Sequence, residues 1–261
     1  MGEDKGKAPR SDGRAAACKK SGESKAASDK PQHSHAREKI LEIHRVLKEM
    51  YPAPVSGLLE PKRENPIDVL VAVILSQATN DTLSDRAFES LKRAFPTWES
   101  VASADPALVE GALAAGGLQK EKTKKIQAAL NKIQEDFGEI SLDRLAGKSP
   151  RECFDYLVSL PGVGPKTAAC VMAFGLNMPA FPVDTHVYRL SKRLGLVPRE
   201  WNPVKTQDYL EDVTPDELKV PLHLLLIRHG REVCTSRKPK CSVCALRDLC
   251  GGEESSGTNL S

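Results

Sequence analysis

The sequence predicts an all-α protein built from many short helices. Apolar residues recur at helical spacing, about one every 3.6 residues, through nearly the whole chain from residue 37 onward. Proline and glycine stand where these periodic segments begin and end, which is their usual place at helix boundaries. No stretch alternates apolar and polar residues over the length of a strand, and no Asn-Gly pair marks a hairpin. A β-sheet is therefore not expected.

Helices are expected along the whole chain from residue 37 onward. The first has its apolar residues between Ile40 and Met50 and ends before Pro52. Residues 66–78 open on a proline and are apolar on all sides, which predicts a buried central helix. Asp81 is expected to cap the helix that follows. Further helices are expected at 106–114, 119–137, 150–158, 165–175, 184–194, 203–211 and 215–229.

The N-terminal segment differs in composition from the rest. Residues 1–36 lack Leu, Ile, Val, Phe, Trp and Tyr, so we expect a disordered, solvated tail, with a weak electrostatic arm for DNA as the alternative. They hold eight basic and five acidic residues, which leaves 30 of each sign in the remainder of a chain of net charge +3. Net charge therefore does not by itself indicate a nucleic-acid partner.

The segments that would direct the chain to a membrane or out of the cell are not found. No apolar run approaches the roughly 20 residues that cross a bilayer. The charged start of the chain does not resemble a secretory signal. We therefore expect a soluble, intracellular protein.

The segment LPGVGPKTAAC, residues 160–170, predicts two helices joined by a tight turn. Gly162 and Gly164 form the turn, and Pro165 opens the second helix. Bare turn amides at a helix N-terminus form an anion site that suits a DNA phosphate. An ordinary interhelical turn is the alternative, and the phosphate site is favoured because Lys166 follows directly.

Lys166 and Asp184 are the candidate catalytic pair. A lysine amine can attack a sugar carbon and form a Schiff base, but it must first lose its proton. At an ordinary pKa of about 10.4, roughly one amine in a thousand is unprotonated near neutral pH. Desolvation against DNA, or proton transfer to Asp184 through water, would have to supply the free base. A surface lysine and a helix-capping aspartate remain the alternatives.

Four of the seven cysteines crowd the C-terminal region with spacing x6, x2 and x5: Cys234, Cys241, Cys244 and Cys250. Such a run predicts a metal site rather than a disulfide scaffold. Zinc sites usually pair two Cys-x2-Cys knuckles, whereas this run has one, so a [4Fe–4S] cluster is favoured over zinc. Cys153 and Cys170 lie in apolar helical patterns and are expected to be core residues.

Together these segments resemble the endonuclease III family of helix-hairpin-helix DNA glycosylases over residues 37–250. The family's LPGVG-x-KTA hairpin stands at 160–168, its VDTH segment at 183–186, and its HGR-x-x-C approach to the cluster at 229–234. The resemblance places the Schiff-base lysine at Lys166, the catalytic aspartate at Asp184 and a [4Fe–4S] cluster on the four cysteines.

The resemblance implies a two-lobed fold. A six-helix lobe with the hairpin would span 59–178, and an iron–sulfur lobe would join 37–58 to 179–251, leaving flexible tails at 1–36 and 252–261. It further implies a monomer that flips oxidised pyrimidines out of double-stranded DNA, removes them, and cleaves the abasic site by β-elimination. The expected location is the bacterial cytoplasm, at the nucleoid, with the nucleus or mitochondrion as alternatives.

Further DNA contacts are expected from Gly162, Gly164, His186, Leu118 and Gln77. Leu118 matches an intercalating leucine of the family, with a hydrophobic staple on its own helix as the alternative. Gln77 departs from the family, whose LSAQATD segment carries its gap-filling glutamine one place later. On a helix that shift turns a side chain by about 100°.

Three other classes of protein are alternatives to this prediction. The adenine-mismatch glycosylase branch typically lacks the lysine found here as Lys166 and carries a further C-terminal domain, whereas this chain ends 11 residues after Cys250. A non-catalytic helix-hairpin-helix DNA-binding protein has no need of Lys166 together with Asp184. A zinc-bearing structural protein is the third alternative.

Overall fold

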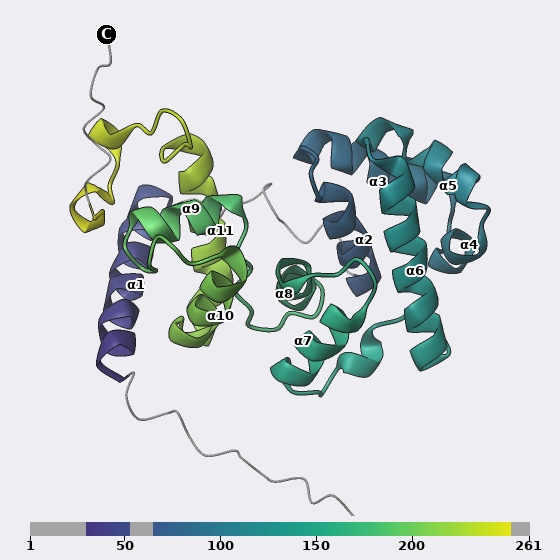
Figure 1. Ribbon diagram of the computed structural model, residues 1–261, viewed down its shortest axis with the longest axis horizontal. Coiled ribbons are helices and arrows are strands. Elements are labelled where there is room, and N and C mark those ends of the chain that lie inside the picture. Colours follow the sequence, from purple (N-terminus) through teal and green to yellow (C-terminus); the bar gives the residue numbers. More distant parts are fainter. Residues whose placement is uncertain (1–29, 53–64, 252–261) are drawn as a thin grey trace, which may run out of the picture.

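The computed structural model describes residues 30–52 and 65–251, and this part of the chain is helical without any strand, which confirms the all-α prediction. Figure 1 shows the helices in two groups lying side by side. The α-helices are α1 (Lys30–Met50), α2 (Pro66–Ser76), α3 (Asp81–Ala94), α4 (Trp98–Ser103), α5 (Pro106–Ala112), α6 (Gln119–Phe137), α7 (Pro150–Ser159), α8 (Pro165–Phe174), α9 (Thr185–Arg193), α10 (Pro203–Val213) and α11 (Asp216–Glu232). Short 3-10 turns are η1 (Ala114–Gly116), η2 (Asp143–Leu145), η3 (Cys241–Val243) and η4 (Arg247–Leu249).

The first core lies among α2–α8. Its buried apolar residues run from Ile67 to Ala180. As the sequence predicts, α2 is central and packs against α3, α6 and α8. Pro66 stands in its first turn, and the Asn65 side chain accepts a hydrogen bond from the Ile67 amide at 2.8 Å. This capping satisfies one of the amides that a helix start leaves without a partner.

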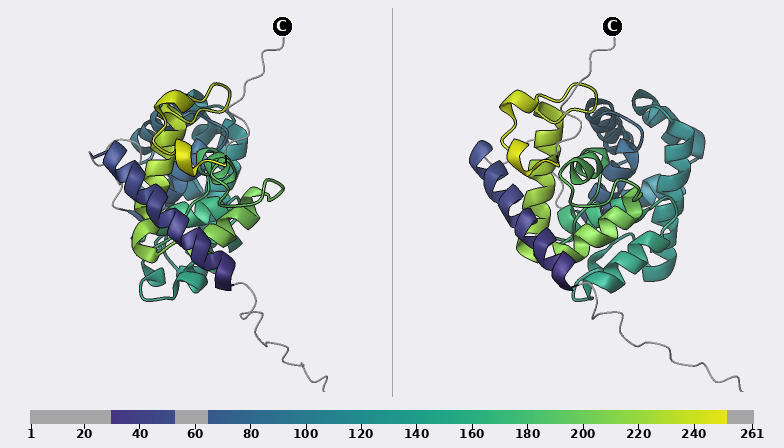
Figure 2. Two further views of the ribbon diagram at one scale, coloured as in Figure 1. Left: turned by 90° about the vertical axis from the view of Figure 1, so that its left-hand side faces the viewer. Right: turned by 60° about the vertical axis from the view of Figure 1, so that its left-hand side comes forward.

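The second core is built from both ends of the described chain. Apolar residues of α1 from Ile40 onward, and Tyr51 directly after it, pack with residues between Phe181 and Leu246. Figures 1 and 2 place α1 on the outer side of α11, so the first helix covers the last one. The boundaries predicted at 59 and 178 stay predictions, since residues 53–64 lie outside the described residues.

The segment that leads from α8 to α9 is fixed from the side of α10 and α11. Glu211 accepts a hydrogen bond from the Phe181 amide at 2.6 Å and another from Lys219 Nζ at 2.6 Å. Lys219 is buried and also pairs with Asp216 at 2.8 Å. Pairing with carboxylates offsets the cost of burying a lysine charge. The chain that enters Asp184 is therefore held by side-chain bonds as well as by packing.

Two details differ from the sequence prediction. α1 begins at Lys30, so residues 30–36 belong to a helix rather than to the predicted tail. The start of this helix is supported by two contacts of His33. Its ring meets the Tyr209 ring edge-on with the ring centroids 5.6 Å apart, and its Nδ1 lies 3.6 Å from Asp212 Oδ2. The cap of α3 is Asn80, whose side chain accepts from the Leu83 amide, and Asp81 is the first helical residue. The rest of the predicted tail lies outside the described residues.

Candidate active site and cysteine loop

The hairpin between α7 and α8 presents open backbone amides. Gly162 has a φ of +77°, and a Cβ there would meet Lys125 Cγ at 2.7 Å, so both the backbone and the space require glycine. Gly164 precedes α8 without any side-chain cap, and nothing lies within 4 Å of where its Cβ would stand. The first amides of α8 are therefore uncapped beside open space, as an anion site requires.

Lys166 lies in the first turn of α8 and is half-buried. Its pKa is raised above the ordinary lysine value, first by the charge of the Cys170 sulfur and then, against the opposing effect of burial, by the Asp184 carboxylate. Burial is the largest influence on the Cys170 thiol and raises its pKa, while the Asp184 and Asp81 carboxylates add to the charges that raise the pKa of Lys166. The free protein therefore holds Lys166 as an ammonium.

Asp184 stands directly before α9. Its Oδ1 accepts a hydrogen bond from the Val187 amide at 2.8 Å, so it caps this helix. Its charge acts on Lys166 from the other core. The structure thus brings the two predicted catalytic residues together, one from each core, and gives the aspartate the capping position as well.

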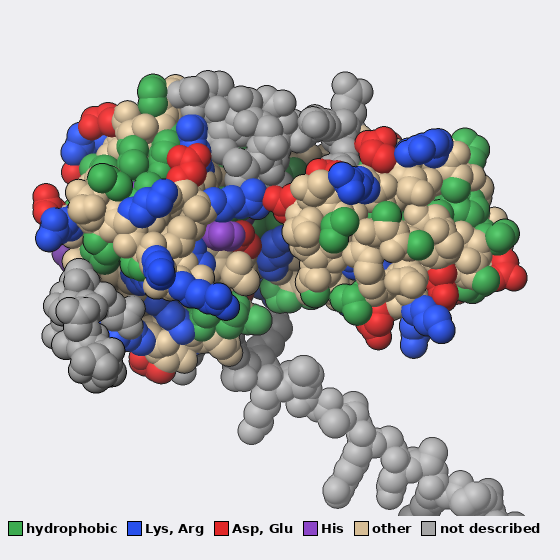
Figure 3. Space-filling view, turned by 90° about the horizontal axis from the view of Figure 1, so that it is seen from above, with side chains coloured by type: hydrophobic (Ala, Val, Ile, Leu, Met, Phe, Trp, Pro, Cys, Tyr) green, Lys and Arg blue, Asp and Glu red, His purple; other side chains and the backbone are tan. Residues whose placement is uncertain are grey.

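Next to this pair an ion pair joins the two cores. Arg231, near the end of α11, lies 2.8 Å from the Asp81 carboxylate at the start of α3. Asp81 also contributes to the raised pKa of Lys166. Figure 3 shows a hollow between the two halves in which basic, acidic and histidine side chains gather. The sequence did not indicate this role for Asp81, because an acidic first-turn residue resembles a cap, and Arg231 stands there only as part of the HGR-x-x-C segment.

Two loops beside the hairpin carry the other predicted DNA contacts. Gln77 Nε2 lies 3.4 Å from both the Gly162 carbonyl and Thr167 Oγ1, while its Oε1 accepts from Lys125 Nζ at 3.1 Å. Leu118 has a φ of +54° and is 55% exposed. A leucine that is more than half exposed does not pack as a hydrophobic staple, so that alternative is not supported.

Two histidines lie near Asp184. His186, in the first turn of α9, is half-buried, and its Nδ1 lies 3.2 Å from Arg189 Nη2. His223, on α11, is buried and packs between the rings of Phe174 and Phe181. Burial lowers the pKa of His223 to about 4, and its Nδ1 has no hydrogen-bond partner among the described residues. The Pro182 backbone, in the segment that enters Asp184, acts against burial and raises the pKa of His223.

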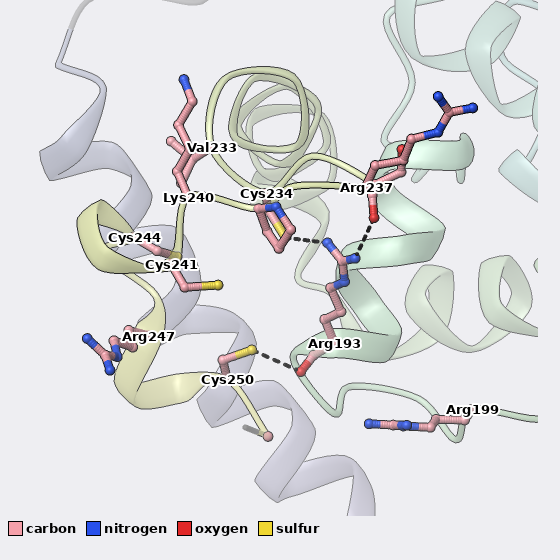
Figure 4. A pocket seen from close by; sticks show the side chains of 13 residues that line it. Arg193, Arg199, Val233, Cys234, Arg237, Lys240, Cys241, Cys244, Arg247 and Cys250 are labelled. Atoms are coloured by element: carbon pink, nitrogen blue, oxygen red, sulfur yellow. Dashed lines mark hydrogen bonds between the residues drawn. The ribbon is translucent and has the colours of Figure 1, made fainter. Parts of the chain in front are cut away.

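The four C-terminal cysteines line one cavity of about 360 Å³. Figure 4 shows Cys234 next to the guanidinium end of Arg193 and Cys250 next to its backbone carbonyl. Arg193 Nη1 lies 3.3 Å from Cys234 Sγ, and Cys250 Sγ donates to the Arg193 carbonyl at 3.3 Å. Cys244 Sγ lies 3.3 Å from His229 Nε2. The other residues of the wall include Arg199, Arg237, Lys240 and Arg247.

The donor set of this cavity fits an iron–sulfur cluster. The four thiols that line this cavity are the ligands that a [4Fe–4S] cluster takes, and the arginine and lysine side chains suit a group of thiolates. Within the described residues no three potential ligands stand close enough to hold a metal ion as they are. Three of the thiols instead contact Arg193 or His229. Binding of the cluster thus requires small movements of these side chains.

Comparison with known proteins places this architecture in a class. The family model described as "HhH-GPD superfamily base excision DNA repair protein" matches residues 71–216, and that of the iron–sulfur binding domain of endonuclease III matches 234–250. The chain is 41% identical over 196 residues to an Arabidopsis thaliana protein assigned provisionally as a DNA glycosylase, covering 73% of this chain and 67% of that one. It is 34% identical to endonuclease III of Escherichia coli, and the match covers 83% of this chain and 96% of that one.

The solved structures agree. A non-covalent endonuclease III–DNA complex superimposes with a TM-score of 0.69 and 30% identity, covering 82% of this chain and 95% of that one. A trapped endonuclease III–DNA covalent intermediate gives the same values. The fold and the site thus define a helix-hairpin-helix base excision DNA repair protein. Within that class, the chain belongs to the endonuclease III family.

Membership confirms the predicted class of enzyme, a DNA glycosylase and abasic-site lyase that acts on DNA, and the predicted iron–sulfur cofactor. None of the described helices is both long and apolar enough to span a membrane. The individual site residues remain predictions, because the comparisons match segments rather than assign roles.

Proposed function

We propose that this protein removes oxidised pyrimidines from duplex DNA, with Lys166 as the nucleophile and Asp184 as its charged partner. The observation that carries the proposal is their position: Lys166 stands in the first turn of α8 beside uncapped amides, and the Asp184 charge reaches it from the other core. Amides that bind a phosphate would set the adjacent sugar against the amine.

The chemistry follows from this position. Lys166 Nζ attacks C1′ of the damaged nucleotide, the bond from C1′ to the base breaks, and the base leaves after taking up a proton. Lys166 gives up one proton before the attack, on desolvation against DNA or through water to Asp184. The C1′–O4′ bond then opens and O4′ takes up a proton, while Nζ loses a second proton and forms the C=N bond of the Schiff base. Loss of a C2′ proton then breaks the bond between C3′ and its oxygen, so the strand is cut on the 3′ side. Asp184 stabilises positive charge on the sugar while the base departs.

The remaining predicted residues take supporting parts in the proposal. Gly162 and Gly164 offer amides to a backbone phosphate, Leu118 enters the space that the flipped base leaves, and Gln77 and His186 contact the same duplex. Cys234, Cys241, Cys244 and Cys250 ligate the [4Fe–4S] cluster. The protein acts as a monomer inside the cell, at the nucleoid of a bacterium or in the nucleus or mitochondrion, and its lobes divide at residues 59 and 178.

Borohydride trapping on duplex DNA with an abasic site tests the assignment of Lys166. Reduction of the imine joins protein to DNA covalently, so the parent should give a slow-migrating adduct. Lys166→Gln should give none while its DNA affinity stays within a few-fold. Lys132→Gln, which changes an exposed lysine on α6 that pairs with Asp136, is the matched control and should trap like the parent. A normal yield of adduct from Lys166→Gln would exclude Lys166 as the nucleophile.

A further inference from the structure

A buried lysine joins the two loops that flank the hairpin. Lys122, in the first turn of α6, is only 3% exposed. Its Nζ donates to Thr79 Oγ1 in the Gln77 loop, residues 77–80, and to the Gly116 carbonyl at 3.2 Å in the Leu118 loop, residues 114–118. The two loops are far apart in sequence, and one side chain therefore holds both.

The direction of the hydrogen bonds in this network follows from the chemistry of lysine. A lysine amine at the end of its chain serves as the donor, so the Thr79 hydroxyl accepts from Lys122. The Thr79 proton is then free for the Gln77 carbonyl or the Gly116 carbonyl, each 3.2 Å away. Both choices tie the Gln77 loop more closely, either to itself or to the Leu118 loop.

The backbone on both sides of this network is held in an unfavourable conformation. Ala78 has a φ of +52° and Leu118 one of +54°, the left-handed region that side chains other than glycine rarely adopt. Such residues persist only where surrounding contacts over-determine them. Gly116 supplies another contact, because a Cβ there would meet Ala87 Cβ at 2.8 Å. Each loop thus has one strained residue within two positions of a group bound by Lys122.

Burying the Lys122 amine costs free energy that a purely structural contact between the loops would not require. No carboxylate among the described residues pairs with it, and Lys125, one turn further on, has the same charge. Burial, with a further effect from Lys125, lowers the pKa of Lys122. An apolar side chain of the same length would fill this space at lower cost. What an apolar side chain would lose is the pair of bonds to the two loops.

We propose that Lys122 is a positioning residue that holds the Gln77 loop and the Leu118 loop in register for insertion into duplex DNA. The inference rests on the proposed function of these loops as DNA contacts. Lys122 itself need not touch DNA, since it is covered. Its removal should release Ala78 and Leu118 from their left-handed conformations and move both loops, which would leave the gap beside a flipped nucleotide poorly filled.

The test compares Lys122→Met with the parent on two substrates under single-turnover conditions. Methionine keeps the length of the side chain and removes the amine. Excision of a paired oxidised pyrimidine, which needs insertion, should slow by about tenfold or more. Cleavage of a pre-formed abasic site should change less than about twofold. Thr79→Val should show the same pattern, and the double variant should be no slower than the slower single one, because both remove the same network.

A second readout does not depend on catalysis. In a duplex with a tetrahydrofuran abasic analogue opposite 2-aminopurine, insertion unstacks the fluorescent base, and Lys122→Met should give less fluorescence than the parent at saturating protein. This keeps the inference separate from the proposed excision activity: a parent that inserts but does not cleave would contradict the latter alone. Lys132→Met, further along α6, is the control and should match the parent in both assays.

Three results would overturn the inference. The first is a folded Lys122→Met protein with parental fluorescence and parental excision. The second is an equal loss of rate on both substrates, which would place the effect in the catalytic centre. The third is a large fall in melting temperature with parental insertion at low temperature, which would make Lys122 a stabilising residue only.

Discussion

The two carboxylate oxygens of Asp184 are not equivalent. Oδ1 is occupied as the cap of α9 by the Val187 amide, whereas no hydrogen bond to Oδ2 exists within the described residues. Since the pKa of Lys166 responds to the Asp184 charge, the capping and electrostatic roles can be separated by a substitution that keeps the shape and removes the charge. Asparagine does so, because it caps helices about as well as aspartate.

Asp184→Asn should therefore slow base removal by at least about 100-fold in single-turnover assays, the lower range for loss of a charged catalytic group. It should also lower the pKa of Lys166, because it removes a charge that raises it. Thermal melting should stay close to that of the parent. Excision at the parental rate would leave Asp184 with the role of a helix cap alone.

Leu118→Ala tests the exposed leucine. Because Leu118 is 55% exposed, truncation should change the free energy of unfolding by less than about 0.5 kcal/mol. Excision of paired lesions should fall sharply, while cleavage of abasic DNA, which has no base to extrude, should fall less. An early melting transition would restore the hydrophobic staple as the explanation, and equal losses on both substrates would argue against insertion.

His223 gives a pH prediction at the same scale. The unfolded chain binds a proton at His223 near pH 6.5, whereas in the folded protein burial lowers its pKa to about 4. Unfolding therefore takes up a proton between these values, and stability that is present above pH 6.5 is lost as the pH falls toward 4. Across the whole range from pH 6.5 to pH 4, this effect lowers the free energy of unfolding by up to about 3 kcal/mol.

Urea denaturation at pH 7.5, 6.5 and 5.5 measures this loss. His223→Asn should show a smaller fall in the free energy of unfolding across that series than the parent, because it has no proton to take up at this position. The comparison between the two proteins cancels the effect of acid on the cluster. Parallel pH dependences would mean that His223 titrates normally in the folded protein.

At the scale of elements, proline and glycine let the sequence predict most helices to within a few residues. Pro66, Pro150, Pro165 and Pro203 each open a helix, and Gly138 ends α6. The hairpin and the cysteine run were found because their residues are neighbours in the chain. Two kinds of feature could not be predicted. One is a contact that joins distant segments of the chain, and the other is a side chain whose environment departs from the pattern of its helix.

Lys122 and Arg231 illustrate the two failures. A Lys-rich helix predicts a solvated face, yet Lys122 is covered by two loops whose approach is decided by tertiary packing. Arg231 meets Asp81 at 2.8 Å although 150 positions separate them, and no local pattern encodes that pair. For the same reason Asn80 rather than Asp81 caps α3: both residue types cap well, and the geometry of the turn decides between them.

The cysteine loop is the element whose stability depends most on its cofactor. It has only the short turns η3 and η4, whose described residues include none that is fully buried. Cys244→Ala should therefore reduce bound iron and soluble yield, since a structural metal site contributes folding energy directly. The parent should contain about four iron and four sulfide per chain.

Cys153→Ala is the matched control for this variant, because Cys153 is buried in the first core and should leave the iron content unchanged. Iron and sulfide analysis with the visible spectrum gives the comparison. One zinc and no sulfide in the parent, purified without added metal, would contradict the cluster.

At the scale of the whole molecule, the two cores meet where α8 packs against α10 and where Phe174 of α8 contacts His223 of α11, and the Arg231–Asp81 pair crosses between them. Both partners are partly exposed, Arg231 at 36% and Asp81 at 61%. A pair so open to water contributes little to stability, because solvent and salt screen it. The pair matters instead for its position, because it lies near Lys166 where the two cores meet.

Arg231→Met should change the free energy of unfolding by no more than about 1 kcal/mol, and that difference should shrink further in high salt. Asp81→Asn should have a similar effect on stability, and the double variant should show a coupling energy of the same small size. Denaturation curves at two salt concentrations measure both. A loss of several kcal/mol would show that the pair is desolvated and fastens the two cores together.

The order in which the ribosome makes this chain has a consequence for α1. Its apolar residues Ile40, Ile43 and Leu47 are covered by partners that include Leu226, which is made almost 180 residues later. At a synthesis rate of about 5–20 residues per second, that delay is roughly 10–35 s. The first core, whose buried residues end at Ala180, can form during this wait. A nascent chain halted before α11 should therefore already protect α2 from proteolysis while α1 is still cleaved.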